Sequence, residues 1–198
     1  MSVRLSVKEY QALQNSKGQT KAKTKKAKPQ SLKIRAFDAQ FFGENEFIMP
    51  RDTSHYKALS YLQNHPEELS SDCEHYEQTF VFHYFDVHHP SIFDMMFAIP
   101  NAGKRSQKVA GQFLAEGLKK GVPDIFVDIA IDPYHGLRVE LKRSTVTVSN
   151  VSDEQWEWLD KYEARGYKAG VAIGYRECID LICGYFGITS KLKKIATC

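Results

Sequence analysis

The stretch GVPDIFVDIAIDPYHGLRVELKR, residues 121–143, decides the fold. Two apolar runs, IFVDIAI and LRVEL, flank the turn-forming sequence DPYHG, which is the pattern of a β-hairpin. Charged residues nevertheless stand at the matching ends of the two runs: Asp124 opens the first, whereas Glu140 and Lys142 close the second. Because acids and lysines are rarely buried unless they are paired, packing alone does not explain this placement.

The two carboxylates of this hairpin are expected to lie close together. Asp124 begins one strand and Glu140 ends its antiparallel neighbour, so the two meet at the same end of the sheet. Carboxylates so placed can hold one Mg²⁺ or Mn²⁺ ion, with positions left for water and phosphate oxygens. Glu140 and Lys142 point to one face, while the Leu141 side chain points into the core and its carbonyl is a further oxygen ligand.

This grouping predicts a metal-dependent phosphodiesterase site, in which the Lys142 ammonium orients or helps deprotonate an attacking water. A surface hairpin with an ordinary Glu–Lys ion pair is the usual origin of a bare ExK sequence. The Pro-Asp pair that lies sixteen residues before Glu140, across a recognisable hairpin, argues against that alternative.

Alternating helices and strands are predicted on both sides of the hairpin. Ser152 and Gln155 form a capping box that starts one helix, and Gly121 is a stop signal for another. Before residue 70 the pattern is weaker, with a helix expected from Thr53. The other expected elements are helices at 70–88, 107–119, 152–165 and 176–186 and strands at 92–100 and 168–175. This order predicts the α/β class, with helices on both faces of a mixed sheet.

The composition indicates one globular domain with extensions. The chain has 198 residues, of which 42% are hydrophobic, and it has neither an 18-residue apolar run nor an apolar N-terminal signal. Its four cysteines show no paired CxxC spacing, which indicates reduced thiols and a cytoplasmic location. We therefore expect a protein that is neither secreted nor embedded in a membrane.

The positive charge is concentrated near the N-terminus. The net charge is +3, but residues 17–28 hold six lysines and no acid, so the rest of the chain carries −3. Such a tract is flexible in isolation and binds polyanions without reading their sequence; Lys21, Lys23, Lys25 and Lys26 are its expected DNA contacts. A solvated linker is an equally good interpretation of the tract alone.

Six short motifs in one order resemble the VRR-NUC branch of the PD-(D/E)XK nucleases. They are EHYEQ, FAIPNAGKR, GVPDI, GLRVELK, VSxxQ and GYKAGVAIGYRECIDLICGYF, which together cover roughly residues 70–187. The resemblance implies a restriction-endonuclease-like core with a mixed central β-sheet flanked by helices. It also implies three regions: a flexible tail at 1–30, an extension of unknown role at 31–69 and a nuclease domain at 70–198.

The resemblance also implies roles for individual residues. Asp124 and Glu140 are similar to the family's metal-binding carboxylates, and Lys142 is similar to its catalytic lysine. Gln155 matches the family's glutamine, which would steady Lys142 or a phosphate, although the capping box already explains its presence. The family's first-helix glutamate, a catalytic and metal-binding position, best matches Glu74, which shares an ExxxQ face with Gln78. Glu77 is the rival for this position. As an alternative, an exposed glutamate near the start of a helix usually does no more than interact favourably with the helix dipole.

The loop NAGKR suits the approach of a phosphate. Gly103 lets the backbone come close, Asn101 adds a polar group, and Lys104 and Arg105 add two cations. A plain turn after a strand is the alternative.

The activity implied by the resemblance is that of a Mg²⁺- or Mn²⁺-dependent DNA endonuclease. Compact members of this branch are similar to enzymes of DNA repair and recombination that cut branched DNA such as the Holliday junction. A homodimer in the cytoplasm of a bacterial or phage-infected cell is expected. Two alternatives remain: a flap, nicking or defence nuclease, or a DNA-binding module without activity.

Overall fold

A computed structural model describes residues 48–99 and 107–192 of the chain. The lysine tract, residues 31–47 of the 31–69 extension and the NAGKR loop lie outside the described residues. Within the described ranges, no helix has both the length and the hydrophobicity that crossing a bilayer requires.

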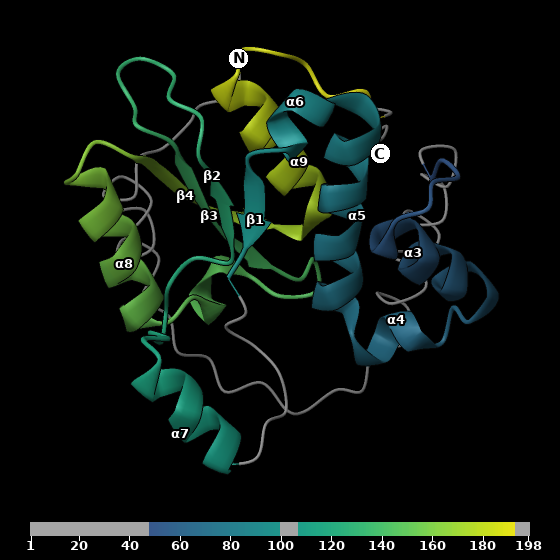
Figure 1. The fold of residues 1–198 in the computed structure, drawn as a ribbon, viewed down its shortest axis with the longest axis horizontal. Coiled ribbons are helices and arrows are strands. Elements are labelled where there is room, and N and C mark those ends of the chain that lie inside the picture. The colour runs from purple at the N-terminus through teal and green to yellow at the C-terminus, as the bar shows by residue number, and fades with distance from the viewer. Residues whose placement is uncertain (1–47, 100–106, 193–198) are drawn as a thin grey trace, which may run out of the picture.

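A four-stranded mixed sheet forms the centre of the fold, as predicted (Figure 1). The strand order is β1-β2-β3-β4, with antiparallel β1/β2 and β2/β3 pairs and a parallel β3/β4 pair. Because a parallel pair needs a crossover, the chain passes through a helix between its last two strands. The strands are β1 Met96–Ala98, β2 Ile125–Val127, β3 Leu137–Lys142 and β4 Lys168–Ile173.

Helices cover both faces of this sheet. The crossover helix α8, Asp153–Glu163, packs on one face of β3 and β4. Two helices, α5 Cys73–His88 and α9 Gly174–Tyr185, pack together against the other face (Figure 1). Alternate residues of β3 therefore face different helices, with Leu137, Val139 and Leu141 in the core shared with α5 and α9.

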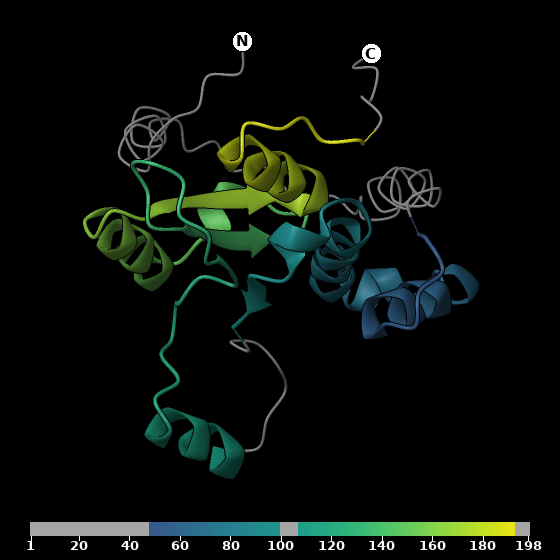
Figure 2. The same cartoon turned by 45° about the horizontal axis from the view of Figure 1, so that its top comes forward.

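The shorter helices lie mostly on the α5 side. The helix α3, Ser54–Asn64, packs against α5, and Thr53 caps it as predicted, accepting from the Tyr56 amide at 3.3 Å. The others are α4 Glu68–Ser71, α6 Pro90–Phe93, the 3₁₀ turn η2 Val148–Asn150 and α7 Gln107–Ala115. Both views draw α7 away from the sheet (Figures 1 and 2). The predicted boundary at residue 70 stays a prediction.

A buried arginine joins α8 to the sheet. The Arg138 guanidinium is 2.8 Å from Asp128 Oδ1. It lies 4.2, 5.3 and 4.4 Å from the ring centres of Phe126, Tyr162 and Tyr167. Since Tyr162 belongs to α8, this desolvated cation–π cluster fixes the position of that helix on the sheet.

Three predicted elements differ from those observed. The segment 92–100 begins as α6, because Pro90 preorganises a helical turn, and only Met96–Ala98 is strand. The helix predicted at 107–119 ends at Ala115, where Gly117 takes φ 103° and the Leu118 amide bonds to Phe113 O at 2.8 Å. The stop signal is thus Gly117 rather than Gly121.

The first strand of the hairpin is also shorter than its apolar run. It ends at Val127 because the Tyr185 hydroxyl takes over the backbone groups that follow. That hydroxyl donates to Ile129 O at 2.8 Å and accepts from the Ile131 amide at 3.1 Å. A side chain from α9 therefore replaces the strand partner.

Candidate active site

The hairpin brings Asp124 and Glu140 together at one end of the β2–β3 ladder. Ile125 pairs with Val139, so the residue before Ile125 stands opposite Glu140. The backbone amide of Leu141 donates to Asp124 Oδ2 at 3.0 Å, which fixes that carboxylate beside β3. Glu140 is fully buried, and its Oε2 atom has no hydrogen-bond donor among the described residues.

The other oxygen of Glu140 gathers two polar side chains. Lys142 Nζ lies 2.7 Å from Glu140 Oε1, and Gln155 Nε2 donates to the same atom. The Gln155 side-chain oxygen also accepts from the Ser152 amide at 2.9 Å, completing the capping box. One amide group thus uses its oxygen for the cap and its nitrogen for Glu140, rather than for Lys142 as the resemblance implied; a contact with a phosphate stays a prediction.

The carboxylate pair retains a proton more strongly than ordinary acids do. Burial, followed by the negative charge of Asp124, raises the pKa of Glu140, although Lys142 opposes the rise. Burial also raises the pKa of Asp124, against the opposing effect of the Leu141 amide and of Lys142. Without a further positive charge, two buried carboxylates in contact therefore ionise fully only at a raised pH.

These residues fit a small divalent cation. The buried Glu140 Oε2 atom is an acceptor that has no donor in the described part of the chain, and a second carboxylate lies beside it. No point within residues 48–99 and 107–192 is surrounded by three or more His, Cys, Asp or Glu side chains. That sparse ligand set suits Mg²⁺, which commonly takes one or two carboxylates and fills its other positions with water and substrate phosphate.

The raised pKa values predict how the metal-free protein responds to pH. In the unfolded chain these groups titrate near ~4, whereas in the folded protein they keep a proton to higher pH. At pH values between the unfolded and the folded pKa values, the folded state therefore binds more protons than the unfolded chain. Its stability falls as the pH rises through the folded pKa values. Urea unfolding in EDTA at about pH 6 and about pH 8.5 measures the fall. Glu140→Gln should shrink it, and an equal fall in this variant would contradict the assignment of the pKa shifts.

The two candidate glutamates of α5 have different surroundings. Glu74, in the first turn, is half-buried, and its charge raises the pKa of Asp124, so its field reaches the site. Glu77 is fully buried, and its Oε1 atom accepts from the Ser144 amide at 3.0 Å and from Cys73 Sγ at 3.2 Å. Glu77 thus holds the chain just after Lys142.

The contact between Glu77 and Ser144 is a part of the site that the sequence did not reveal. It joins residues 67 positions apart, so no local pattern reports it. Gly174 is constrained at the same place: its φ is 82°, and a Cβ there would lie 2.9 Å from Ser144 Cβ. The signal in the sequence was that Cys73 and Glu77 are four residues apart and therefore lie on one face of a helix.

The predicted phosphate contacts are not placed. The loop residues Asn101, Gly103, Lys104 and Arg105 lie outside the described residues, as do Lys21, Lys23, Lys25 and Lys26. The structure thus brings Asp124, Glu140, Lys142 and Gln155 together, with Glu74 near enough to act on Asp124 by its charge.

Comparison with known proteins gives a structural similarity. No protein-family model matches the chain, and no curated protein matches it significantly. A solved structure described as a VRR_NUC domain protein is similar, at 28% identity and a TM-score of 0.49; the match covers 59% of this chain and 95% of that chain. The chain itself has a mixed α/β fold with a carboxylate pair at the end of the β2–β3 hairpin and a glutamine on the crossover helix that contacts this pair.

Proposed function

We propose that this chain is a Mg²⁺- or Mn²⁺-dependent DNA endonuclease. The observation that carries the proposal is the buried Asp124–Glu140 pair. Lys142 and Gln155 converge on Glu140 Oε1, while Oε2 has no donor within residues 48–99 and 107–192. Burying two adjacent acids costs stability, because their charges repel one another and are poorly solvated, so their presence in the core favours a functional role.

Each residue of the site would have its own role in phosphodiester hydrolysis. Asp124, Glu140 and the Leu141 carbonyl would hold the ion, which supplies positive charge at the scissile phosphate and makes a bound water more acidic. Gln155 fixes the rotation of the Glu140 carboxylate, so that Oε2 remains free to bind. Lys142 lies on the same face as Glu140 and would orient the attacking water or assist its loss of a proton.

The proposed substrate is branched DNA, such as the four-way junction, cut by a homodimer with one site on each strand. This finer assignment rests on the family resemblance in the sequence. A panel of single-stranded, duplex, nicked, flap and four-way-junction DNA, each with Mg²⁺, Mn²⁺ or EDTA, tests it. Preferred cutting of the junction is expected. Preference for a flap or nick would move the protein to another nuclease class, and binding without cutting in either metal would indicate an inactive DNA-binding module.

The two glutamates of α5 should separate catalysis from stability. Glu74→Gln is expected to slow cleavage by about tenfold or more, because it removes a charge that acts on Asp124. Glu77→Leu should cost about 2 kcal/mol of unfolding free energy, because the Ser144 amide loses a buried acceptor. Glu74→Leu should cost less than about 0.5 kcal/mol. Single-turnover rates measure the first effect, and urea unfolding measures the second. A larger loss of rate from changing Glu77 to Gln than from changing Glu74 to Gln would move the catalytic role to Glu77.

The lysine tract is expected to supply affinity that is independent of sequence. Deleting residues 1–30 removes six lysines of the 17–28 tract and should weaken DNA binding. Each lost phosphate contact should flatten the slope of log affinity against log salt by roughly 0.7–0.9. The position of the cut and the single-turnover rate at saturating enzyme should stay nearly unchanged. An unaltered slope would show that the tract is only a linker, and a shifted cut would show that it positions the DNA.

A further inference from the structure

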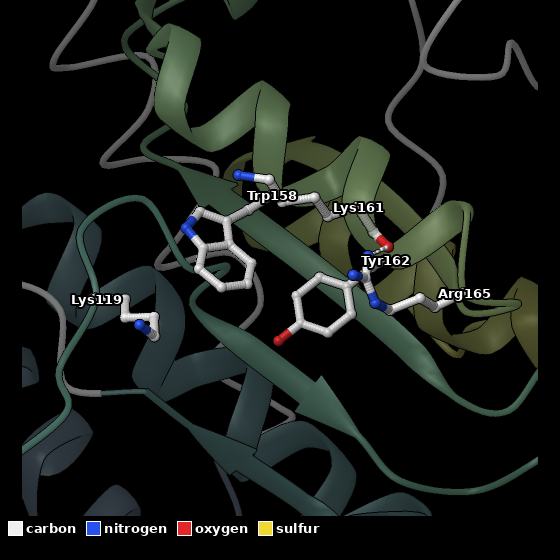
Figure 3. A pocket seen from close by; sticks show the side chains of 5 residues that line it. All are labelled: Lys119, Trp158, Lys161, Tyr162 and Arg165. Atoms are coloured by element: carbon white, nitrogen blue, oxygen red, sulfur yellow. Dashed lines mark hydrogen bonds between the residues drawn. The ribbon is translucent and has the colours of Figure 1, made fainter.

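A hollow of about 280 Å³ lies beside α8, apart from the carboxylate pair, and is lined by Lys119, Trp158, Lys161, Tyr162 and Arg165 (Figure 3). Its volume is slightly below the range of about 300–1,000 Å³ that is usual for drug-sized ligands. Aromatic rings form much of the wall, and three cations stand around it. A flat ring that carries negative charge matches this lining in both shape and sign.

Two separate segments build the hollow and are fastened to each other. One wall is α8, and the other is the chain between α7 and β2, from which Lys119 faces Trp158 (Figure 3). Trp158 Nε1 donates to Lys120 O at 3.0 Å, and Lys120 Nζ lies 2.6 Å from Glu154 Oε1. Tyr162 is held from below by the Arg138 cluster. The walls are therefore preorganised, which lowers the entropic cost of binding.

The cations of the hollow remain available to a ligand. Lys161 pairs with Glu157 at 3.1 Å and lies over the Trp158 ring, 5.2 Å from its centre. Lys119 and Arg165 have no carboxylate partner within ion-pair distance among the described residues. Glu154, which belongs to the same helix, is paired with Lys120. One guanidinium nitrogen of Arg165 donates to Lys161 O at 2.9 Å. Among the described residues, the rim thus offers two positive charges that no carboxylate neutralises, and a third that is shared with Glu157.

The hollow and the active site lie along the same helix, α8. Gln155, which contacts Glu140, is three residues before Trp158 and seven before Tyr162, so all three lie on neighbouring stripes of α8. At 1.5 Å per residue, the hollow extends roughly 5–15 Å along the helix axis from Gln155. A strand that leaves the scissile phosphate along α8 would reach it within its next nucleotides.

We infer that this hollow binds one unpaired nucleotide of a DNA strand, with its base against Trp158 and its phosphates near Lys119 and Arg165. Base stacking on an aromatic ring is insensitive to sequence, because every base has a flat face, and a base inside a duplex is not free to enter. The hollow therefore recognises unpaired DNA next to the cut. This role in cleavage rests on the proposed nuclease function, whereas the binding itself does not.

Fluorescence in EDTA tests the binding without any cleavage. The chain has two tryptophans, so Trp156→Phe leaves Trp158 as the sole emitter and Trp158→Phe leaves only Trp156. Oligothymidylate should quench Trp158 but not Trp156, and a blunt duplex should quench Trp158 far less. Equal quenching by duplex, by thymidine monophosphate at the same nucleotide concentration, or by polyglutamate would overturn the assignment to an unpaired strand.

Affinity measurements give a second test of the inferred binding site. Trp158→Ala should weaken binding of oligothymidylate by about tenfold. Arg165→Gln and Lys119→Gln should each lower the salt slope for single strands by about 0.7. Lys57→Gln is the matched control, since it removes the same charge from α3, on the opposite side of the molecule from α8 (Figure 1). A slope loss in Lys57→Gln equal to that in Arg165→Gln would overturn the inference. If the protein cuts no DNA yet Trp158 is quenched, the nuclease proposal fails and the binding site stands.

Discussion

Asp124→Asn and Glu140→Gln should each abolish metal-dependent DNA cleavage, lowering the single-turnover rate by about a thousandfold or more. Each variant keeps the size of the side chain but removes one of the two anionic ligands at the end of the β2–β3 hairpin. A metal ion contributes several kcal/mol to stabilising charge in the transition state, and a rate falls tenfold for each 1.36 kcal/mol that is lost. Cleavage of the preferred substrate in Mg²⁺, followed over single turnovers, measures the loss.

These variants should fold and still bind DNA. Removing one of two buried acids relieves their mutual repulsion, so the metal-free variants should be at least as stable as the wild type above neutral pH. Asp128→Asn is the matched control, because it changes an equivalent aspartate on the same chain segment whose partner is Arg138 rather than the site. A rate within tenfold of wild type for either site variant would show that this pair is not the metal site.

Lys142→Ala should slow cleavage by about a hundredfold to ten-thousandfold, the range for the loss of a group that assists proton transfer. The ammonium is largely buried and lies 2.7 Å from Glu140 Oε1, so no other described lysine takes its place at the site. Single-turnover rates at saturating metal measure the effect. Lys57→Ala, an exposed lysine paired with Asp52, is the control that should leave the rate unchanged.

The contact between Lys142 and Glu140 adds a test of that role. Because Lys142 lowers the pKa of Glu140, its removal raises that pKa further, and protons then compete more strongly with metal near neutral pH. Raising the pH should therefore restore the metal affinity of Lys142→Ala but not its rate. Recovery of both would mean that Lys142 only tunes metal binding.

Local signals in the sequence predicted the parts of the fold that local chemistry determines. The start of α8 follows from Ser152 and Gln155, whose reciprocal hydrogen bonds lie within three residues. The approach of Asp124 to Glu140 follows from an antiparallel hairpin with one recognisable turn. The mixed sheet follows from the order of the elements, because a helix between two strands permits a parallel pair.

Long-range contacts account for what the sequence did not predict. The strand β2 ends early because the Tyr185 hydroxyl comes from a helix more than fifty residues later. The burial of Glu77 depends on Ser144, and the hollow beside Trp158 depends on the path of the chain around Lys119. None of these contacts has a period or a cap that a sequence pattern can report.

The assignment of the buried carboxylate pair as a divalent-metal site is tested most directly by calorimetric titration of Mn²⁺ into the full chain without DNA. Two buffers with different ionisation enthalpies, at about pH 7.5, separate metal binding from proton release. The wild type should bind Mn²⁺ and release a proton, because burial raises the pKa of Glu140 to about 8, and metal binding displaces the proton that it holds at this pH. Glu140→Gln should lose most of the affinity and the proton release. Unchanged binding in Glu140→Gln, or binding by the wild type without release of a proton, would contradict the assignment.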